Sequence, residues 1–303
     1  MKQLVILSGK GGTGKTSLAA VFAHLAHDGS YPLKTVLADA DVDAANLELV
    51  LHPQRIETHE FTGGSVAVID PIRCQNCGVC EQACRFDAIK STPDGYTVDP
   101  IACEGCAACV YQCPEGSIRM EPQNTGRWYR SKSLYGTLFH ADLYPAQENS
   151  GKLVTLIKQN ARLYALDNNV PILIVDGPPG IGCPVIAAAA GADLALIITE
   201  PTVAGIHDLK RILQTTIHFR IPVLVVLNKA DIYQKGAADI VTTCVELGVA
   251  LIGQIPFDST VTEAMRNGEP VTAYQPEASS SQSMKAIWRV VFKRLISPGG
   301  SYD

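Results

Sequence analysis

The sequence predicts an α/β protein built on a doubly wound, mostly parallel sheet, with a second, small α+β domain inserted into it. Three observations predict this fold class. Short apolar runs alternate with helical stretches along most of the 303 residues. A glycine-rich loop follows the first apolar run. Eight of the ten cysteines lie within residues 74–113, where the alternation stops.

Five apolar runs have the composition of strands buried on both faces of a parallel sheet. They span residues 4–7, 35–38, 172–175, 194–198 and 223–227. Helical stretches between them cover residues 16–26, 152–166 and 206–218. Alternation of this kind predicts helices packed on both faces of the sheet. Ligands of such sheets bind beyond the carboxyl ends of the strands, and the motifs described below all fall there.

Residues 66–122 break this alternation and are rich in Cys, Gly and Pro. They contain a 29-residue repeat, in which Cys74 recurs as Cys103 and Cys84 recurs as Cys113. A duplicated half-unit that carries its own metal folds without a large core. We therefore expect residues 66–122 to form an inserted domain, with residues 1–65 and 123–303 forming one discontinuous nucleotide-binding domain. Residues 123–150, which lead back from the insert, have the least interpretable sequence.

Composition and charge narrow the class of protein. Hydrophobic residues make up 47% of the chain, which is enough for a sizeable packed core. The net charge of −5 argues against a nucleic-acid partner, which needs a clustered basic face. No apolar run reaches the roughly 18 residues of a membrane span, and no cleavable signal is apparent. We expect a cytoplasmic protein without a membrane partner.

The stretch GKGGTGKT, residues 9–16, follows a predicted strand and opens a predicted helix, which is the context of a phosphate-binding loop. Backbone N–H groups of such a loop converge on phosphate oxygens at the helix N-terminus. Lys15 is expected to reach the β- and γ-phosphates and Thr16 to hold Mg²⁺. The loop residues expected to bind nucleotide are Gly9, Lys10, Gly11, Gly12, Thr13, Gly14, Lys15, Thr16 and Ser17.

Two cysteine runs have the spacing of bacterial ferredoxins, with gaps of two, two and three residues. Three thiolates of each run then surround one [4Fe–4S] cluster, while the fourth reaches the neighbouring cluster. The expected ligands are Cys74, Cys77, Cys80 and Cys113 for the first cluster and Cys84, Cys103, Cys106 and Cys109 for the second. Zinc is the competing metal, but it favours isolated pairs of Cys-x-x-Cys. Arg85 replaces the proline that usually follows the fourth cysteine and removes no ligand.

The second lysine of the phosphate loop, Lys10, makes the chain resemble the deviant Walker A ATPases of the MinD, ParA and nitrogenase iron-protein group. The resemblance implies an ATP-dependent homodimer in which Lys10 reaches the partner's nucleotide. The stretch LADADVDAANL is similar to the first switch of that group. By this resemblance Asp39 or Asp41 orients the attacking water, and a further aspartate, Asp43, helps to hold Mg²⁺. The catalytic residues implied are Lys10, Lys15, Asp39 and Asp41.

The stretch ILIVDGPPG resembles the second switch of the same group. Asp176 would then hold Mg²⁺ through water, and the N–H of Gly180 would sense the γ-phosphate. The base is less settled, because LNKAD, residues 227–231, also matches the guanine-binding pattern of GTPases through Asp231. The deviant group instead contacts adenine with an Asn and a PFD turn, which favours ATP. The contacts expected on this basis are Asn228, Lys229, Pro256, Phe257 and Asp258.

Two further features have ordinary explanations. Cys183 follows Asp176 by seven residues, where nitrogenase iron protein holds a cluster shared between subunits. A shared cluster needs two cysteines from each chain, and only Cys244 is otherwise free, so we expect Cys183 to be buried and inert. Residues 284–297 form a basic amphipathic stretch, which we expect to pack on the sheet rather than on a membrane surface.

The whole chain resembles MinD-superfamily ATPases with an inserted ferredoxin domain, which often lie beside proteins related to nitrogenase-cofactor carriers. The insert lies between the two switches, whose conformations depend on the γ-phosphate. The leading hypothesis is an ATPase that couples dimerisation to electron transfer from two [4Fe–4S] clusters to a partner. A second hypothesis is an ATP-dependent cluster carrier, although the late Cys-x-x-Cys of Mrp-type carriers is absent. A third is a MinD- or ParA-type positioning ATPase with structural clusters.

Overall fold

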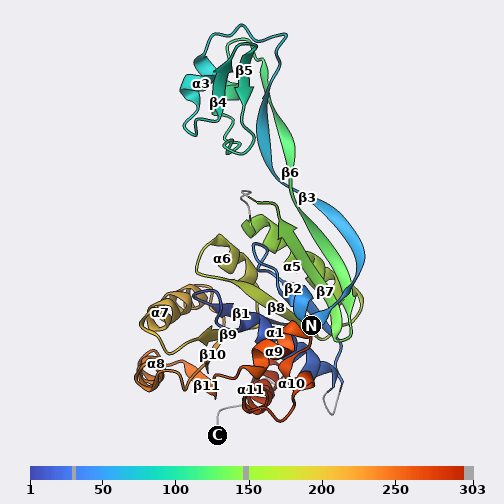
Figure 1. Ribbon diagram of the computed structural model, residues 1–303, viewed down its shortest axis with the longest axis vertical. Coiled ribbons are helices and arrows are strands. Elements are labelled where there is room, and N and C mark those ends of the chain that lie inside the picture. Colours follow the sequence, from blue (N-terminus) through green and yellow to red (C-terminus); the bar gives the residue numbers. More distant parts are fainter. Residues whose placement is uncertain (29–31, 146–149, 297–303) are drawn as a thin grey trace. The chain divides into compact units, whose positions relative to one another are not determined.

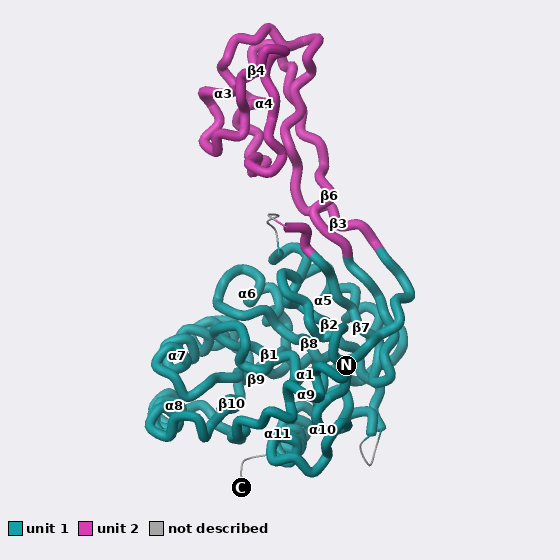
Figure 2. The backbone as a smooth tube through the Cα atoms, viewed as in Figure 1, with its two compact units in different colours: residues 1–58, 128–142, 150–303 teal, residues 59–127, 143–149 magenta. Residues whose placement is uncertain are grey.

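The structure is a computed structural model that describes residues 1–28, 32–145 and 150–296 (Figure 1). Internal contacts divide the chain into two compact units (Figure 2). Unit 1 contains residues 1–58, 128–142 and 150–303, and unit 2 contains residues 59–127 and 143–149. Unit 2 therefore extends on both sides of the insert expected over residues 66–122. The stretch expected as a link, residues 123–150, is divided between the units, and its residues 146–149 lie outside the described part.

The main sheet has the strand order β11-β10-β9-β1-β8-β2-β7-β6-β3, and β4 pairs with β5 in a separate small sheet. The strands are β1 (Lys2–Ser8), β2 (Thr35–Asp39), β3 (Gln54–Ile69), β4 (Ile89–Thr92), β5 (Gly95–Val98), β6 (Ile118–Ser133), β7 (Gly136–Leu143), β8 (Ile172–Pro179), β9 (Leu194–Thr199), β10 (Val223–Asn228) and β11 (Ala250–Ile255). The five predicted strands are confirmed as β1, β2, β8, β9 and β10. Neighbouring strands from β11 to β7 all pair in parallel, as the fold class requires.

The helices are α1 (Lys15–His27), α2 (Leu47–Leu51), α3 (Val79–Ala83), α4 (Ala108–Gln112), α5 (Ser150–Asp167), α6 (Cys183–Ala189), α7 (Val203–His218), α8 (Gln234–Glu246), α9 (Thr260–Arg266), α10 (Val271–Tyr274) and α11 (Ser279–Ile296). The three predicted helices are confirmed as α1, α5 and α7. Helix α7 begins three residues earlier than expected, because the Thr202 side chain accepts a hydrogen bond from the N–H of Gly205 and caps the helix there.

Helix α11 completes the core on one face of the sheet. Its apolar side chains, among them Ile287 and Val291, are buried in one cluster with α1 and alternate residues of the strands. The ring of Trp288 lies 4.9 Å from that of Phe22 in α1. The expectation that this amphipathic stretch belongs to the core is confirmed up to residue 296, where the described part ends. None of the described helices combines the length and apolar character needed to cross a bilayer.

Strands β3, β6 and β7 were not anticipated from the sequence. β3 and β6 have 16 residues each, and both pass from unit 1 into unit 2. Only three of the 16 residues of β3 are buried, and its first half is mostly charged and polar, so it lacks the long apolar run that marks a buried strand. Only residues 134–135 separate β6 from β7, and a connection this short joins antiparallel neighbours. The sheet is therefore mostly rather than wholly parallel.

In unit 2 the backbone repeats with the same 29-residue period as the cysteines. Positions one period apart share a positive φ, in the pairs Asn76 and Gly105, Gly78 and Ala107, and Asp87 and Gly116. The first cysteine of each run donates its N–H to an aspartate carbonyl four residues earlier, at 3.0 Å from Cys74 and 3.1 Å from Cys103. The two halves of this unit are therefore one backbone design used twice.

Candidate nucleotide site and cysteine-lined cavities

The phosphate loop connects β1 to α1 in a conformation that depends on glycine. Gly12 and Gly14 have φ values of 76° and 97°, which side chains rarely adopt. A Cβ on Gly14 would lie 2.6 Å from the side-chain nitrogen of Asn228. Helix α1 has no side chain capping its N-terminus, so its first N–H groups are available to an anion.

Lys15 lies inside this loop, and only 5% of its surface is exposed. Its Nζ donates to the Ser8 hydroxyl at 2.9 Å. Burial lowers the pKa of Lys15, and the nearby carboxylates of Asp176 and Asp41 partly offset that effect. The ammonium is thus held at the end of β1, where the loop closes over it.

A cavity next to the loop encloses about 1040 Å³ of empty space, part of it open to solvent. The predicted residues that line it are Gly11, Gly12, Gly14, Lys15, Thr16, Ser17, Asp41, Asn228, Lys229, Pro256, Phe257 and Asp258. Sequence reasoning missed five further lining residues, namely Asn46, Val261, Thr262, Met265 and Met284. Gly9, Lys10 and Thr13 line a smaller cavity against β9 and α7 instead.

Two buried carboxylates stand next to each other, because Asp39 at the end of β2 is in register with Asp176 within β8. Asp39 accepts three backbone hydrogen bonds, from Asp41, Asn46 and Leu47, at 2.9 to 3.2 Å. Neither oxygen of Asp176 is hydrogen-bonded by any residue that the structure describes. Burial raises the pKa of Asp176 to about 7, although Thr16 and Lys15 act against the rise.

The other residues of the two switch segments differ in their access to the cavity. Asp41 lines it, and burial raises the pKa of its carboxyl group, with Lys15 opposing the shift. Asp43 is exposed and does not line the cavity. The N–H of Gly180 donates to the Ser8 carbonyl at 3.0 Å, so it is occupied in this conformation. Of Asp39, Asp41 and Asp43, Asp41 is the one that lines the cavity.

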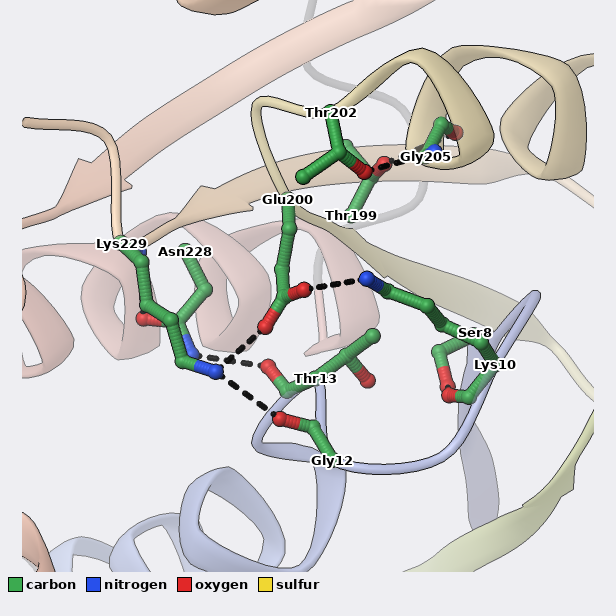
Figure 3. Close-up of polar contacts among 10 residues, drawn as sticks. All are labelled: Ser8, Lys10, Gly12, Thr13, Thr199, Glu200, Thr202, Gly205, Asn228 and Lys229. Carbon is green, nitrogen blue, oxygen red and sulfur yellow. Dashed lines mark hydrogen bonds and ion pairs between the residues drawn. The ribbon is translucent and has the colours of Figure 1, made fainter. Parts of the chain in front are cut away.

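Glu200, directly after β9, joins two lysines of the site (Figure 3). Its buried carboxylate lies 2.7 Å from Nζ of Lys10 and also pairs with Lys229. Lys229 in turn donates to the carbonyl of Gly12 at 3.1 Å. Burial opposes ionisation of Glu200, but the hydrogen bonds from both lysines outweigh it and lower its pKa. Lys10 is therefore held by its own chain, and the phosphate loop is fastened to β9 and β10.

The side chains considered for base binding, Asn228, Asp231 and Asp258, all make hydrogen bonds within the protein. Asp231 accepts a hydrogen bond from the backbone N–H of Phe257 at 2.7 Å. The Asn228 side chain donates to the carbonyl of Thr13 at 2.7 Å. Asp258 accepts from Thr260 and Ser280, and these hydrogen bonds lower its pKa to about 2 despite partial burial. All three side chains thus support the shape of the cavity.

Two cavities in unit 2 are lined by cysteines, with about 320 and 330 Å³ of empty space. Cavity 1 is lined by Cys74, Cys77, Cys80 and Cys113. Cavity 2 is lined by Cys84, Cys103, Cys106 and Cys109. Each cavity thus takes three cysteines from one run and the fourth from the other. The Ser117 hydroxyl lies 3.2 Å from Sγ of Cys113 and lowers the pKa of that thiol.

Across the described ranges 1–28, 32–145 and 150–296, no three His, Cys, Asp or Glu side chains converge closely enough to hold a single metal ion. The cysteines of each run instead line the two cavities described above. The remaining two cysteines differ from each other, because Cys244 is buried and Cys183 is exposed at the start of α6. The expectation that Cys183 is buried is wrong, since the first turn of α6 leaves it on the surface.

Comparison with known proteins places unit 1 in a family. Residues 4–271 match the model described as the CobQ/CobB/MinD/ParA nucleotide binding domain. An uncharacterized protein of Methanocaldococcus jannaschii is 32% identical over 290 residues, which are 94% of this chain and 95% of that protein. The chain belongs to the CobQ/CobB/MinD/ParA nucleotide-binding family.

Two other proteins resemble the chain, one in its structure and one in part of its sequence. MinD of Pyrococcus horikoshii, solved with Mg-ADP, has a TM-score of 0.57 and 18% identity, covering 99% of each chain. This likeness shows that the fold is MinD-like. An iron-sulfur cluster carrier protein of Aquifex aeolicus is 27% identical over 135 residues, which are 41% of this chain and 37% of the carrier. The resemblance to MinD-type ATPases found in the sequence is confirmed at the level of family and fold.

Glu200, which pairs with Lys10 and Lys229, was also missed from the sequence. An acidic residue directly after an apolar run stands at the carboxyl end of a strand, where ligands of α/β sheets bind. That position was a sufficient signal to consider it beside Asp39 and Asp176. The partners of Glu200, Lys10 and Lys229, are separated from it by 190 and 29 residues, so their convergence depends on strand order.

Replacing Asp176 with Asn is expected to stabilise the nucleotide-free protein above pH 7 while weakening Mg²⁺-dependent nucleotide binding. The folded pKa of about 7 exceeds the unfolded value of 3.8. The stability due to proton binding is therefore complete below about pH 4 and is lost as the pH rises through 7. At pH 8 the gain in free energy of unfolding is on the order of a few kcal/mol. Thermal melts across pH 4–8, with the exposed Asp239→Asn as control, measure it; a gain that does not depend on pH contradicts it.

Proposed function

We propose that this protein binds and hydrolyses ATP and couples nucleotide-driven motion of its switch segments to electron transfer from two [4Fe–4S] clusters to a partner protein. The observation that carries the proposal is the pair of cavities in unit 2, each lined by four cysteines. They occur in a chain whose unit 1 combines a phosphate loop with an unpartnered buried carboxylate, Asp176. The proposal therefore rests on two features of one chain, the cysteine-lined cavities and the phosphate loop beside Asp176.

The ligands proposed for Mg²⁺ are the Thr16 hydroxyl and, through water, Asp176. An unpaired buried carboxylate costs several kcal/mol, and a cation removes that cost. Asp43 is a weaker candidate than the sequence implied, because it is exposed and does not line the cavity. For orienting the attacking water we favour Asp41 over Asp39, whose oxygens already accept three backbone hydrogen bonds.

Adenine is the base that the cavity supports best. In a guanine site an aspartate accepts hydrogen bonds from the base, but Asp231 is engaged by the N–H of Phe257. The cavity is also lined by Phe257, Val261, Met265 and Met284. Apolar and thioether side chains suit a base that is held by stacking and shape.

The cysteines fit [4Fe–4S] clusters better than they fit zinc. A zinc ion needs four ligands within about 2.3 Å of one point, and no group in the described residues converges so tightly. A cluster of four irons needs thiolates spread around a wider space, which describes both cavities. When bound there, such clusters supply one-electron transfer. The chain supplies the thiolates, and each cavity has one buried cysteine, Cys80 or Cys109, and one exposed cysteine, Cys77 or Cys106.

A chain of contacts in unit 1 joins the first switch to the strands that lead into unit 2. The Asp39 carboxylate accepts the N–H groups at the start of α2. One residue into that helix, Glu48 pairs with Arg55 at the beginning of β3 at 3.2 Å. Glu48 also lies 3.3 Å from the buried His140 of β7. Movement of Asp39 on nucleotide binding would therefore shift Glu48 and the root of β3.

His140 connects the same contacts to the second long strand. Its Nε2 lies 2.9 Å from the Ser131 hydroxyl of β6, and its ring stacks near Tyr129 at 5.0 Å. Burial lowers the pKa of His140, with Glu48 opposing the shift. Glu48 thus contacts β3 through Arg55, and it contacts β6 through His140 and Ser131. This is the physical basis that we propose for coupling.

The dimer implied by Lys10 requires a change from the present structure. Lys10 now pairs with Glu200 of its own chain. To reach a partner's nucleotide it must leave that carboxylate, so Glu200 and the second nucleotide compete for one ammonium. Nearly two-thirds of the Lys10 side chain is already covered in the ion pair. The partner's phosphates must therefore outweigh a partly desolvated contact.

A second candidate function is an ATP-dependent carrier of iron–sulfur clusters. The match to the Aquifex aeolicus iron-sulfur cluster carrier favours it, although that match covers only part of either chain. The exposed Cys183 is one cysteine in unit 1 that a transfer reaction would find accessible. In a carrier, ATP would change the retention of iron, whereas in an electron-transfer protein iron would stay bound through repeated cycles.

Lys10→Ala is expected to abolish dimerisation driven by a non-hydrolysable ATP analogue, measured by size-exclusion chromatography with light scattering. Glu200→Gln is expected to retain it at a several-fold lower analogue concentration, because Lys10 no longer leaves an ion pair. Dimerisation of the Lys10→Ala variant that equals wild type would refute the role given to this lysine.

Each cavity takes its fourth cysteine from the other run, and this predicts which double substitutions have additive effects on the iron content. The anaerobically purified wild type is expected to hold about eight iron atoms per chain. Cys113→Ser should remove about half, and adding Cys74→Ser should cost little more because both line cavity 1. Adding Cys103→Ser instead should remove the remainder, because Cys103 lines cavity 2. Zinc in place of iron, or equal losses in both double variants, would overturn the assignment.

Coupling predicts that reduction changes the affinity for ATP, and linkage requires that ATP changes the reduction potential equally. We expect the dissociation constant for Mg-ATP to differ several-fold between the dithionite-reduced and the oxidised protein. Glu48→Gln should abolish this difference and leave the oxidised affinity unchanged, whereas the exposed Glu246→Gln should preserve it. Equal affinities in the wild type, or loss of iron to an apo-ferredoxin on adding ATP, would favour the carrier function.

A further inference from the structure

The two cysteine-lined cavities differ at a position of the repeat whose side chain, in the second copy, contacts one of the cysteines. Ser117 of the second repeat corresponds to Ala88 of the first, one period of 29 residues earlier. Their backbones confirm the equivalence, because the N–H of Asp70 donates to the Ser117 carbonyl at 2.8 Å and that of Asp99 to the Ala88 carbonyl at 2.7 Å. The two positions are therefore the same place in the fold, one with a hydroxyl and one without.

Ser117 makes two contacts with the sulfur of Cys113. Its hydroxyl oxygen lies 3.2 Å from Sγ, and its backbone N–H donates to the same atom at 3.4 Å. A thiolate bound to metal only accepts hydrogen bonds, so the hydroxyl must be the donor. Ser117 is 4% exposed, which limits competition from water for that hydroxyl. At the equivalent place in cavity 2, Ala88 lines the cavity and has no hydroxyl to donate.

The rest of the lining is mainly apolar in both cavities, with Ile69, Val79 and Ile118 among the residues of cavity 1. Cavity 1 includes the polar side chains of Gln75 and Tyr96. Cavity 2 has Phe86 and Met120, and otherwise mostly alanines. Charge does not separate the two, because each cavity is lined by one carboxylate residue, Glu115 in cavity 1 and Glu104 in cavity 2.

Arginines are also balanced between the two cavities. Arg73 donates to the Glu115 carbonyl at 3.1 Å beside cavity 1. Arg85 lines an open groove together with Cys106, a cysteine of cavity 2. The difference between the sites is therefore one of hydrogen bonding to a cysteine sulfur and not of net charge.

We propose that Ser117 gives the site of cavity 1 the higher reduction potential, so that the first electron added to unit 2 rests there. This inference rests on the proposed function, in which both cavities hold [4Fe–4S] clusters. An added electron increases the negative charge on the sulfurs, and a hydrogen-bond donor stabilises that charge. Position 88, the equivalent of Ser117 in cavity 2, has no hydroxyl to supply this stabilisation. Ser117 is a positioning residue in this scheme, because it acts through the Cys113 sulfur.

The consequence is a direction for electrons within the unit. One electron taken up from a reductant distributes between the sites according to their potentials, with no proton or bond involved. Cavity 2 is then the site that loses the electron to cavity 1, and cavity 1 is the site from which a partner withdraws it. The repeat supplies two similar sites, and Ser117 makes them inequivalent.

The test is a stepwise anaerobic reduction with dithionite, followed by electron paramagnetic resonance against potential, on the full-length wild type and three variants. The wild type is expected to show two one-electron steps that differ on the order of tenfold in equilibrium constant, or about 59 mV. Ser117→Ala should lower the upper potential and bring the steps together. Ala88→Ser should raise the lower one, and the double variant should restore the separation with the order of the sites exchanged.

Iron analysis separates failure of this inference from failure of the proposed function. Absence of iron and of absorption near 400 nm in the wild type defeats the proposed function itself. About eight iron atoms per chain with coincident steps, or steps that Ser117→Ala leaves unmoved, defeats only the role of Ser117. Cys113→Ser identifies which step belongs to cavity 1, since that step alone should disappear or change its spectrum.

Discussion

The burial of two carboxylates on adjacent strands is the constraint on which the nucleotide site depends. Asp39 and Asp176 are in register on β2 and β8 and are fully buried. Such a pair repels, and each raises the cost of ionising the other. Asp39 is stabilised by backbone N–H groups of the segment that follows it, but Asp176 has no such support in the described residues. The negative charge of Asp176 is therefore the one that the proposed Mg²⁺ would compensate. Because Asp39 lies beside it, the same ion would also act on the segment that donates to Asp39.

Much of unit 1 was predictable because its signals are local. A buried parallel strand must be apolar on both faces, so an apolar run such as residues 172–175 is recognisable in the sequence. A phosphate loop is recognisable because it needs its glycines at fixed spacing. Strands β3 and β6 gave no comparable signal, because their exposed residues are polar on both sides. Glu200 and its two lysines meet only through the order of strands β9, β1 and β10, which a sequence does not display. Exposure of Cys183 depends on where α6 begins, and boundaries are set by tertiary packing.

Unit 2 has a small apolar core, and part of that core is made of the cysteines proposed to bind metal. Its buried apolar cluster is small, and two of its five buried members are the cysteines Cys80 and Cys109. A chain segment of this size gains little from burying apolar area alone. If the cavities bind metal as proposed, the binding free energy is also folding free energy for this unit. The cysteine set was predictable from spacing, but the hydroxyl of Ser117 became informative only when the structure placed it against Cys113.

The crossing of the two cysteine runs has a consequence for the ancestry of unit 2. Each cavity borrows its fourth cysteine from the other half, so neither half encloses a complete cavity by itself. A single ancestral copy would have needed a twin, as in a symmetric dimer of small peptides, before the halves were fused into one chain. Since fusion, loss of either half would dismantle both cavities at once. The segment can therefore be inherited or discarded only as a whole, while single positions such as 88 and 117 remain free to diverge.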